Sequence, residues 1–202
     1  VAAGMAGGST DAAAVLVGVN RMFDLGFTKK ELMERGVKLG ADVPYCIMRG
    51  TALSEGIGEI LTELPAPPQC HLVIAKPQIS VSTKAVYGKL RVNELAPEEH
   101  PDIDGMMAAI KNGDLDGVIE RLGNVLETVT VPDHPEIAEI KEMMMENGAC
   151  GSLMSGSGPT VFGIYKDREL AEKACQALRE ADGGRLTRQV YLTEFYNRKK
   201  AR

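Results

Sequence analysis

Glycines and hydroxyl residues crowd the first ten positions of the chain, and together they could hold an anion. The stretch reads VAAGMAGGST, with Gly4, Gly7 and Gly8 ahead of Ser9 and Thr10. Glycine lets a ligand approach the backbone closely, and a helix starting just behind the loop would offer unpaired N–H groups and the positive end of its dipole. The stretch therefore predicts a phosphate-binding loop. The alternative is a mobile terminus that Ser9 or Thr10 merely caps.

Two well-known phosphate loops do not match this spacing. The pattern G-x-x-x-x-G-K-[ST] needs a lysine after its second glycine, whereas Ser9 follows Gly8. Gly4, Gly7 and Gly8 also fail to fit G-x-G-x-x-G. Any anion site here belongs to another type.

A carboxylate in the stretch LGADVPY (39–45) is the second candidate for chemistry. Asp42 lies between a glycine and Pro44, which is typical of a turn residue that follows a helix. The same carboxylate could act as a general base, and spacing alone leaves both interpretations open.

The stretch MSGSGPT (154–160) is the third candidate. Gly156, Ser157 and Gly158 predict a tight turn whose backbone N–H groups are free, a possible second anion site. A plain hairpin turn explains the same residues equally well.

Composition and charge exclude several classes of protein. The chain has 202 residues, 44% of them hydrophobic, and a formal net charge of −5. This charge argues against nucleic acid or an anionic membrane as the main partner. Neither a signal peptide nor an apolar stretch long enough to span a bilayer is present. We therefore expect a cytoplasmic protein that binds neither nucleic acid nor membrane.

Cysteines and histidines are too scattered to predict a metal site. No C-x-x-C or H-E-x-x-H pattern occurs, so we expect reduced, mostly buried thiols. The residues in question are Cys46, Cys70, Cys150, Cys175, His71, His100 and His134.

Helices and short strands must position the first two candidates. Apolar periodicity predicts a helix over residues 11–23, with an N-cap among Ser9, Thr10 and Asp11. A second helix is predicted over 28–39, with Thr28 and Glu31 forming a capping box and Gly40 ending it. Residues 51–64 read as two strands around a glycine turn. The face predicted to be buried in the first helix comprises Ala12, Val15, Leu16, Val19 and Phe23.

The remaining chain alternates between strands and helices after the proline-rich linker 65–68. Strands are predicted at 70–77 and 189–195, and a strand–turn–strand at 150–165. Amphipathic helices are predicted over 115–129, around 137–144 and over 171–181. The sequence thus indicates an α+β protein in two parts divided near residue 66.

Taken together, four stretches resemble the GHMP kinase superfamily, and more narrowly its branch acting on cytidine diphosphate-linked methylerythritol. They are AAGMAGGSTDAA, LGADVPY, GTALSEGIGEIL and SGSGPTVF. The resemblance covers essentially the whole chain. It implies a two-domain α+β GHMP-kinase fold, with residues 1–66 as the remainder of the N-terminal ATP-binding domain and 67–202 as the C-terminal domain.

The resemblance also implies roles for individual residues. Asp42 matches the family's catalytic aspartate, and Thr83 and Tyr87 match positions that meet the small-molecule substrate. Tyr87 would stack on the cytosine ring, whereas a partly buried helix residue is the alternative. Mg²⁺ is expected to accompany ATP, touched by the hydroxyl of Ser9 or Thr10. The residues expected to bind ATP are Val1, Ala2, Ala3, Gly4, Met5, Ala6, Gly7, Gly8, Ser9, Thr10, Gly156, Ser157 and Gly158.

Members of the superfamily carry a further N-terminal segment, with strands of the first domain and a lysine that partners the aspartate. The resemblance therefore implies that this chain is N-terminally truncated and lacks those strands. We expect apolar helix faces to be exposed where those strands would pack, and the chain to have weak activity without them.

Three alternatives stay open at this point. Another kinase of the superfamily could act on homoserine or a mevalonate derivative. A non-catalytic module could use the same loops only to hold a nucleotide. A scaffold could use both glycine stretches only as turns.

Overall fold

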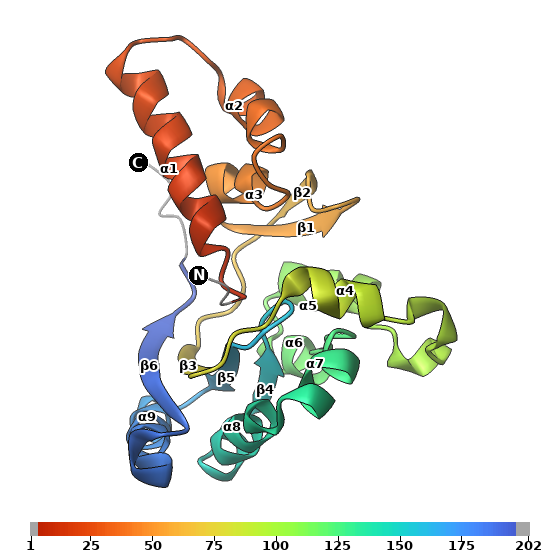
Figure 1. Ribbon diagram of the computed structural model, residues 1–202, viewed down its shortest axis with the longest axis vertical. Helices are drawn as coiled ribbons and strands as arrows, with labels where there is room; N and C mark the ends of the chain where they lie inside the picture. Colours follow the sequence, from red (N-terminus) through yellow and green to blue (C-terminus); the bar gives the residue numbers. More distant parts are fainter. Residues whose placement is uncertain (1–3, 197–202) are drawn as a thin grey trace. The chain divides into compact units, whose positions relative to one another are not determined.

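The chain changes from a mainly helical first part to a sheet-containing second part within its proline-rich stretch (Figure 1). The computed structural model describes residues 4–196. The first unit comprises Ala6–Ala66, and the second comprises Pro67–Tyr196 together with Gly4 and Met5. Both mix helices with antiparallel strands, which confirms the predicted α+β class.

Three helices and one hairpin form the first unit. Ala13, Leu32, Val43 and Ile47 are its buried core, contributed by all three helices. The predicted strands at 51–64 are confirmed as an antiparallel hairpin. The elements are α1 (Gly7–Met22), α2 (Lys29–Gly36), α3 (Val43–Met48), β1 (Thr51–Glu55) and β2 (Ile60–Leu64).

Helix α2 begins as predicted and ends earlier than predicted. The Thr28 hydroxyl accepts a hydrogen bond from the Glu31 N–H, while the Glu31 carboxylate accepts one from the Thr28 N–H at 2.8 Å. This capping box fixes the start. Regular helix stops at Gly36 rather than Leu39, because the Lys38 and Leu39 N–H groups donate to carbonyls three residues back and tighten the last turn.

Helix α1 begins at Gly7, four residues before the predicted start, so its N-cap prediction is wrong. Ala6 is the N-cap residue, and no side chain caps it. The Thr10 hydroxyl instead donates to the Ala6 carbonyl within the first turn. The glycines of the predicted loop therefore lie partly inside the helix.

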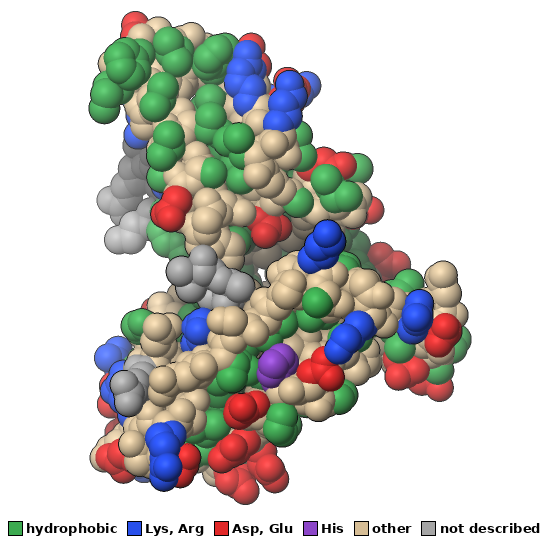
Figure 2. Space-filling view, in the orientation of Figure 1, with side chains coloured by type: hydrophobic (Ala, Val, Ile, Leu, Met, Phe, Trp, Pro, Cys, Tyr) green, Lys and Arg blue, Asp and Glu red, His purple; other side chains and the backbone are tan. Residues whose placement is uncertain are grey.

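The predicted buried face of α1 is only half correct. Ala13 is buried, and Ala12 and Leu16 are partly buried against the core. Val15, Val19 and Phe23 are exposed, because α2 and α3 cover only the Ala13 side among residues 4–196. Figure 2 shows hydrophobic side chains on the surface of the first unit, in the region of α1.

A four-stranded antiparallel sheet organises the second unit, in the order β4-β5-β3-β6. β3 pairs with β5 from His71↔Tyr165 to Ala75↔Val161, and with β6 along its other edge. All four predicted strands of this part are confirmed. They are β3 (His71–Pro77), β4 (Gly151–Met154), β5 (Val161–Tyr165) and β6 (Thr187–Glu194).

Helices cover both faces of this sheet (Figure 1). Helices α8 and α9 pack against one face, where Val73 and Ile140 are fully buried. Helix α6 packs against the other through Ile119, which contacts a cluster around Leu72 and Ile164. The helices are α4 (Thr83–Lys89), α5 (Ile103–Asn112), α6 (Leu115–Glu120), α7 (Glu127–Asp133), α8 (Pro135–Glu146) and α9 (Arg168–Glu180), with short 3₁₀ turns at Val92–Glu94, Pro97–Glu99 and Ala181–Gly184.

The predicted helix over 115–129 is wrong, because the chain forms two short helices there. Helix α6 ends at Glu120 and α7 begins at Glu127. Between them Asn124 makes hydrogen bonds to the turn after β4. Tertiary contacts thus replace the helical hydrogen bonds that the apolar period predicted. The predicted helices around 137–144 and over 171–181 are confirmed as α8 and α9.

Across the described part of the chain, every helix is too short or too polar to cross a bilayer.

Candidate functional site

The start of α1 presents open hydrogen-bond donors. Thr10 is the first residue whose N–H joins the helix ladder, donating to the Ala6 carbonyl at 2.8 Å. The amides of Gly7, Gly8 and Ser9 make no hydrogen bond to residues 4–196. The first turn contains no acidic side chain. Three free donors at the positive end of a 16-residue helix are suited to an anion.

Neither backbone conformation nor packing within the described structure requires glycine at positions 7 and 8. Both residues are helical, and a Cβ at either would meet no atom within 4 Å. Glycine in a helix costs roughly 0.5–1 kcal/mol relative to alanine. Within residues 4–196, the space beside the Cα atoms of these two glycines is therefore open.

Asp42 lies in the segment that packs against this helix start. The residue is the N-cap of α3, and its carboxylate makes no hydrogen bond or ion pair with residues 4–196. A Cβ at Gly40 would lie 3.8 Å from Ser9 Oγ. The Thr10 hydroxyl lies 3.5 Å from Cys46 Sγ. The first unit thus places the segment that carries Asp42 against the side chains of the first turn of α1.

The second glycine-rich stretch is a tight turn between β4 and β5. Gly156 and Gly158 adopt positive φ values of 56° and 82°, and the Gly158 N–H closes the turn onto the Ser155 carbonyl at 3.0 Å. The amides of Gly156 and Ser157 have no partner in the described chain. The turn therefore offers two adjacent free donors.

Gly4 packs directly against this turn. Its carbonyl accepts a hydrogen bond of 2.6 Å from the Ser155 hydroxyl. Its φ is +67°, and a Cβ would lie 2.2 Å from the Ser155 carbonyl oxygen. Only glycine fits, so within the second unit Gly4 itself lies against the turn.

Thr83 also reaches the turn, from the start of α4. Its hydroxyl shares a hydrogen bond of 2.8 Å with that of Ser157. Tyr87 lies one helical turn further on and is 61% exposed, so the alternative of a partly buried residue is wrong. Its ring is free to stack on a ligand.

The other predicted loop residues are less informative. Met5 is half exposed and Ala6 adopts a left-handed conformation. Val1, Ala2 and Ala3 lie outside the described residues.

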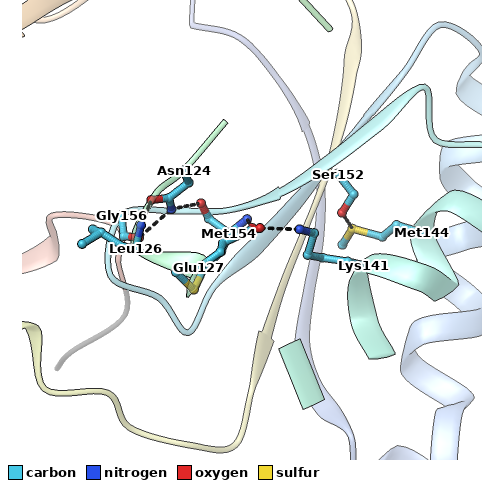
Figure 3. A network of polar contacts seen from close by, with 8 residues as sticks. All are labelled: Asn124, Leu126, Glu127, Lys141, Met144, Ser152, Met154 and Gly156. Carbon is cyan, nitrogen blue, oxygen red and sulfur yellow. Dashed lines mark hydrogen bonds and ion pairs between the residues drawn. The ribbon is translucent and has the colours of Figure 1, made fainter. Parts of the chain in front are cut away.

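Sequence reasoning missed the side chains that hold the second turn. Asn124, Glu127 and Lys141 form a polar network behind it (Figure 3). No motif marked them, and the apolar period of 115–129 concealed Asn124 inside a predicted helix. Glu127 and Lys141 also line a pocket of about 370 Å³ with Val131, Pro132 and Ala138.

Cysteine and metal chemistry have little support in the described region. All four cysteines are free; Cys70 and Cys175 are buried, whereas Cys150 is exposed. Burial raises the pKa of Cys70 to about 11, and it also raises the pKa of Cys175. Within residues 4–196, no three His, Cys, Asp or Glu side chains lie together as a metal site would require.

Comparison with known families identifies the class of protein. The model of the GHMP kinase N-terminal domain matches residues 1–50, and that of the GHMP kinase C-terminal region matches 106–183. A crystal structure of a homoserine kinase from Cytophaga hutchinsonii superposes with a TM-score of 0.81 at 20% identity, over 96% of this chain and 66% of that one. The chain has the GHMP kinase fold.

Closer relatives identify the family. A 4-diphosphocytidyl-2-C-methyl-D-erythritol kinase of Lachnospira eligens is 57% identical over 97% of this chain and 66% of its own length. The enzyme of that name from Lachnoclostridium phytofermentans is 52% identical over 98% and 67%. A crystal structure of 4-(cytidine 5'-diphospho)-2C-methyl-D-erythritol kinase superposes with a TM-score of 0.77 at 30% identity, over 95% and 66%. The chain belongs to the 4-diphosphocytidyl-2-C-methyl-D-erythritol kinase family, and it spans about two thirds of the length of these relatives.

Proposed function

We propose that the protein transfers the γ-phosphoryl group of ATP to the 2-hydroxyl of 4-diphosphocytidyl-2-C-methyl-D-erythritol. The observation that carries the proposal is the open start of α1, with three free amides, packed against the segment that bears Asp42. The names of the relatives support the choice of substrate.

ATP phosphates would bind to backbone amides. The first unit, taken by itself, offers the free amides of Gly7, Gly8 and Ser9 at a helix start, and the second unit, taken by itself, offers those of Gly156 and Ser157 in its turn between β4 and β5. Phosphoryl transfer depends mainly on positioning and on stabilising the charge of the phosphate oxygens. Fixed amide donors meet both needs without rearranging during the reaction.

Asp42 would act as the general base. Its carboxylate is exposed and has no partner among residues 4–196, so it can accept a proton. As the 2-hydroxyl oxygen forms its bond to the γ-phosphorus, the bond between that phosphorus and the bridging oxygen breaks. ADP leaves with the bonding electrons, and the hydroxyl proton passes to Asp42.

Thr83 and Tyr87 would bind the acceptor substrate. The exposed ring of Tyr87 is suited to stacking on cytosine. The Thr83 hydroxyl is hydrogen-bonded to that of Ser157 in the second turn. The helix that would contact the substrate is therefore linked directly to the turn that would contact the nucleotide.

Of the two hydroxyl groups in the first turn of α1, that of Ser9 is better suited to bind Mg²⁺ than that of Thr10. The Thr10 hydroxyl already donates to the Ala6 carbonyl, whereas that of Ser9 makes no hydrogen bond within the described part. Ser9 would therefore hold the ion, which prefers few protein ligands and neutralises phosphate charge when bound.

The test is an ATP-consumption assay with 4-diphosphocytidyl-2-C-methyl-D-erythritol. The assay uses this chain and a chimaera that adds the third of the L. eligens relative left uncovered by the match. We expect turnover in the chimaera, and a loss of kcat by about 100-fold to 10,000-fold in Asp42→Asn, because a general base contributes about that much. Nucleotide affinity should be unchanged.

Other outcomes would contradict the proposal. Nucleotide binding without turnover in a folded chimaera would indicate a binding module. Turnover with homoserine or mevalonate, but not with the cytidylated substrate, would indicate another kinase of this superfamily.

A further inference from the structure

The turn between β4 and β5 has an unusual distribution of hydrogen bonds. All four carbonyls from residue 154 to residue 157 accept one. Gly158 N–H donates to Ser155, and the buried Thr130 hydroxyl donates to Ser157 at 3.3 Å. The Asn124 amide group donates to the other two, Met154 and Gly156, at 2.8 Å each.

This distribution leaves the turn with donors only. Its carbonyls from residue 154 to residue 157 already accept hydrogen bonds. Within residues 4–196, the backbone groups of the turn that remain free are the N–H groups of Gly156 and Ser157. A turn that presents amides and no free carbonyl attracts an anion. Asn124 accounts for half of the engaged carbonyls and is part-buried itself.

A second anchor holds the strand end that leads into the turn. Glu127 Oε1 accepts a hydrogen bond of 2.7 Å from the Met154 N–H, and its Oε2 lies 2.6 Å from Lys141 Nζ. The side chains of Glu127 and Lys141 are only 19% and 26% exposed. Three elements, α7, α8 and β4, are thereby tied together (Figure 3).

We propose that Asn124 and Glu127 are positioning residues, which hold the turn at 155–158 so that its free amides face a nucleotide phosphate. The inference rests on the proposed function for the identity of the ligand. Neither residue touches that ligand in this proposal; both act through the backbone of the turn. Lys141 fixes the carboxylate of Glu127.

The sharpest variant is Asn124→Asp. The aspartate keeps an oxygen for the Leu126 N–H, which Asn124 Oδ1 accepts at 3.0 Å. It loses both donations to the turn and places a carboxylate against two carbonyls. Asn147→Asp is the matched control, because Asn147 also donates its side-chain amide to one backbone carbonyl, that of Met143, away from the turn.

Two variants at position 127 separate the ion pair from the backbone contact. Glu127→Gln keeps an acceptor for the Met154 N–H and loses the charge facing Lys141. Glu127→Ala loses both. Glu172→Gln is the control, since it removes the charge from another ion pair of the same unit, with Arg168.

Two measurements are made on each variant of the full chain. Amide hydrogen exchange over residues 154–158 reports on the turn, and titration with ATP reports on the ligand. We expect Asn124→Asp and Glu127→Ala to speed exchange and weaken ATP binding by about tenfold, the equivalent of one lost hydrogen bond to a buried group. Glu127→Gln should retain part of both. Glu127→Ala should also lower the melting temperature more than Glu172→Gln does, because it leaves the part-buried Lys141 unpaired, so both measurements are made well below the melting temperature of each variant.

The outcomes separate this inference from the proposed function. Unchanged exchange at 154–158 in Asn124→Asp and Glu127→Ala would overturn the positioning role, whatever ATP does. Faster exchange with unchanged ATP affinity would overturn the link to the nucleotide. If neither the unsubstituted chain nor the chimaera binds ATP, the proposed function is contradicted, and the exchange data still decide whether these side chains hold the turn.

Discussion

At the scale of single residues, the glycines of the two loops differ in what requires them. Gly4 and Gly158 have positive φ values and no room for a Cβ, which would lie 2.2 Å from the Ser155 carbonyl oxygen and 2.6 Å from Met154 Sδ, respectively. Gly7 and Gly8 have ordinary helical conformation and open space. A ligand approaching the backbone is the remaining reason for glycine there.

Gly8→Ala tests that reason. The substitution should leave the free energy of unfolding unchanged or raise it by up to about 1 kcal/mol, because alanine favours helix. It should weaken ATP binding by about tenfold or more, because the new methyl group displaces the phosphate from the amides. Urea unfolding and ATP titration measure the two effects.

Gly18→Ala is the matched control for this experiment. Gly18 lies in the same helix, is exposed, and a Cβ there meets no atom within 4 Å. The control should gain stability by about 1 kcal/mol and keep its ATP affinity. Equal ATP affinity in both variants would mean that the start of α1 does not bind the phosphates.

At the scale of elements, helices end where other hydrogen bonds replace the helical pattern. Helix α2 gives way after Gly36 to a tighter turn, in which the Lys38 and Leu39 N–H groups donate to carbonyls three residues back. Helix α3 approaches Gly36 so closely that Val43 and Ile47 leave no room for a side chain. Helices α6 and α7 stay separate because Asn124 bonds to the turn after β4. Between α6 and α7, tertiary contacts override a local preference for helix.

Gly36→Ala should therefore have the opposite effect to Gly18→Ala. Its Cβ would lie 2.8 Å from Val43 Cγ1 and 3.2 Å from Ile47 Cδ1. We expect a loss of about 1–3 kcal/mol in the free energy of unfolding of the first unit, as for overpacked cores. Amide exchange in α2 and α3 measures it. A gain in stability would show that helix propensity outweighs this contact.

At the scale of the whole molecule, buried thiols make stability depend on alkaline pH. Cys70 is 5% exposed in the second unit, and burial raises its pKa from about 9 to about 11. Above pH 9 the unfolded chain loses this proton while the folded chain keeps it. The folded state is then disfavoured, so stability falls as pH rises from about 9 to about 11.

Cys70→Ala should reduce this dependence. Between pH 9 and 10 the slope should be smaller in the variant, by up to about 1.4 kcal/mol per pH unit, the limit for a single proton. Urea unfolding at several pH values measures it. The pKa of Tyr165 is also raised by burial, but its phenol contributes mainly at higher pH. Identical slopes in both proteins would contradict a buried, neutral Cys70.

A feature could be predicted from the sequence only where residues that are neighbours in the chain form it. The capping box at Thr28 was readable because all its atoms come from four consecutive residues. The glycine turn at 155–158 was readable because its residue types are rarely combined otherwise. Asn124 was not, since its partners are 30 and 32 residues away and nothing near it in sequence marks them.

The sequence by itself determined the α+β class, the strands of both sheets, the helices α1, α2, α8 and α9, and the four stretches that resemble one kinase family. These depend on short-range patterns of apolar residues, glycines and caps, which act before the chain is folded. The tertiary structure alone decided that α1 starts at Gly7 with open amides, that Gly4 packs on the second turn, and that Asn124 and Glu127 hold that turn. The last two features join residues far apart in the chain, so their geometry exists only once the second unit has folded.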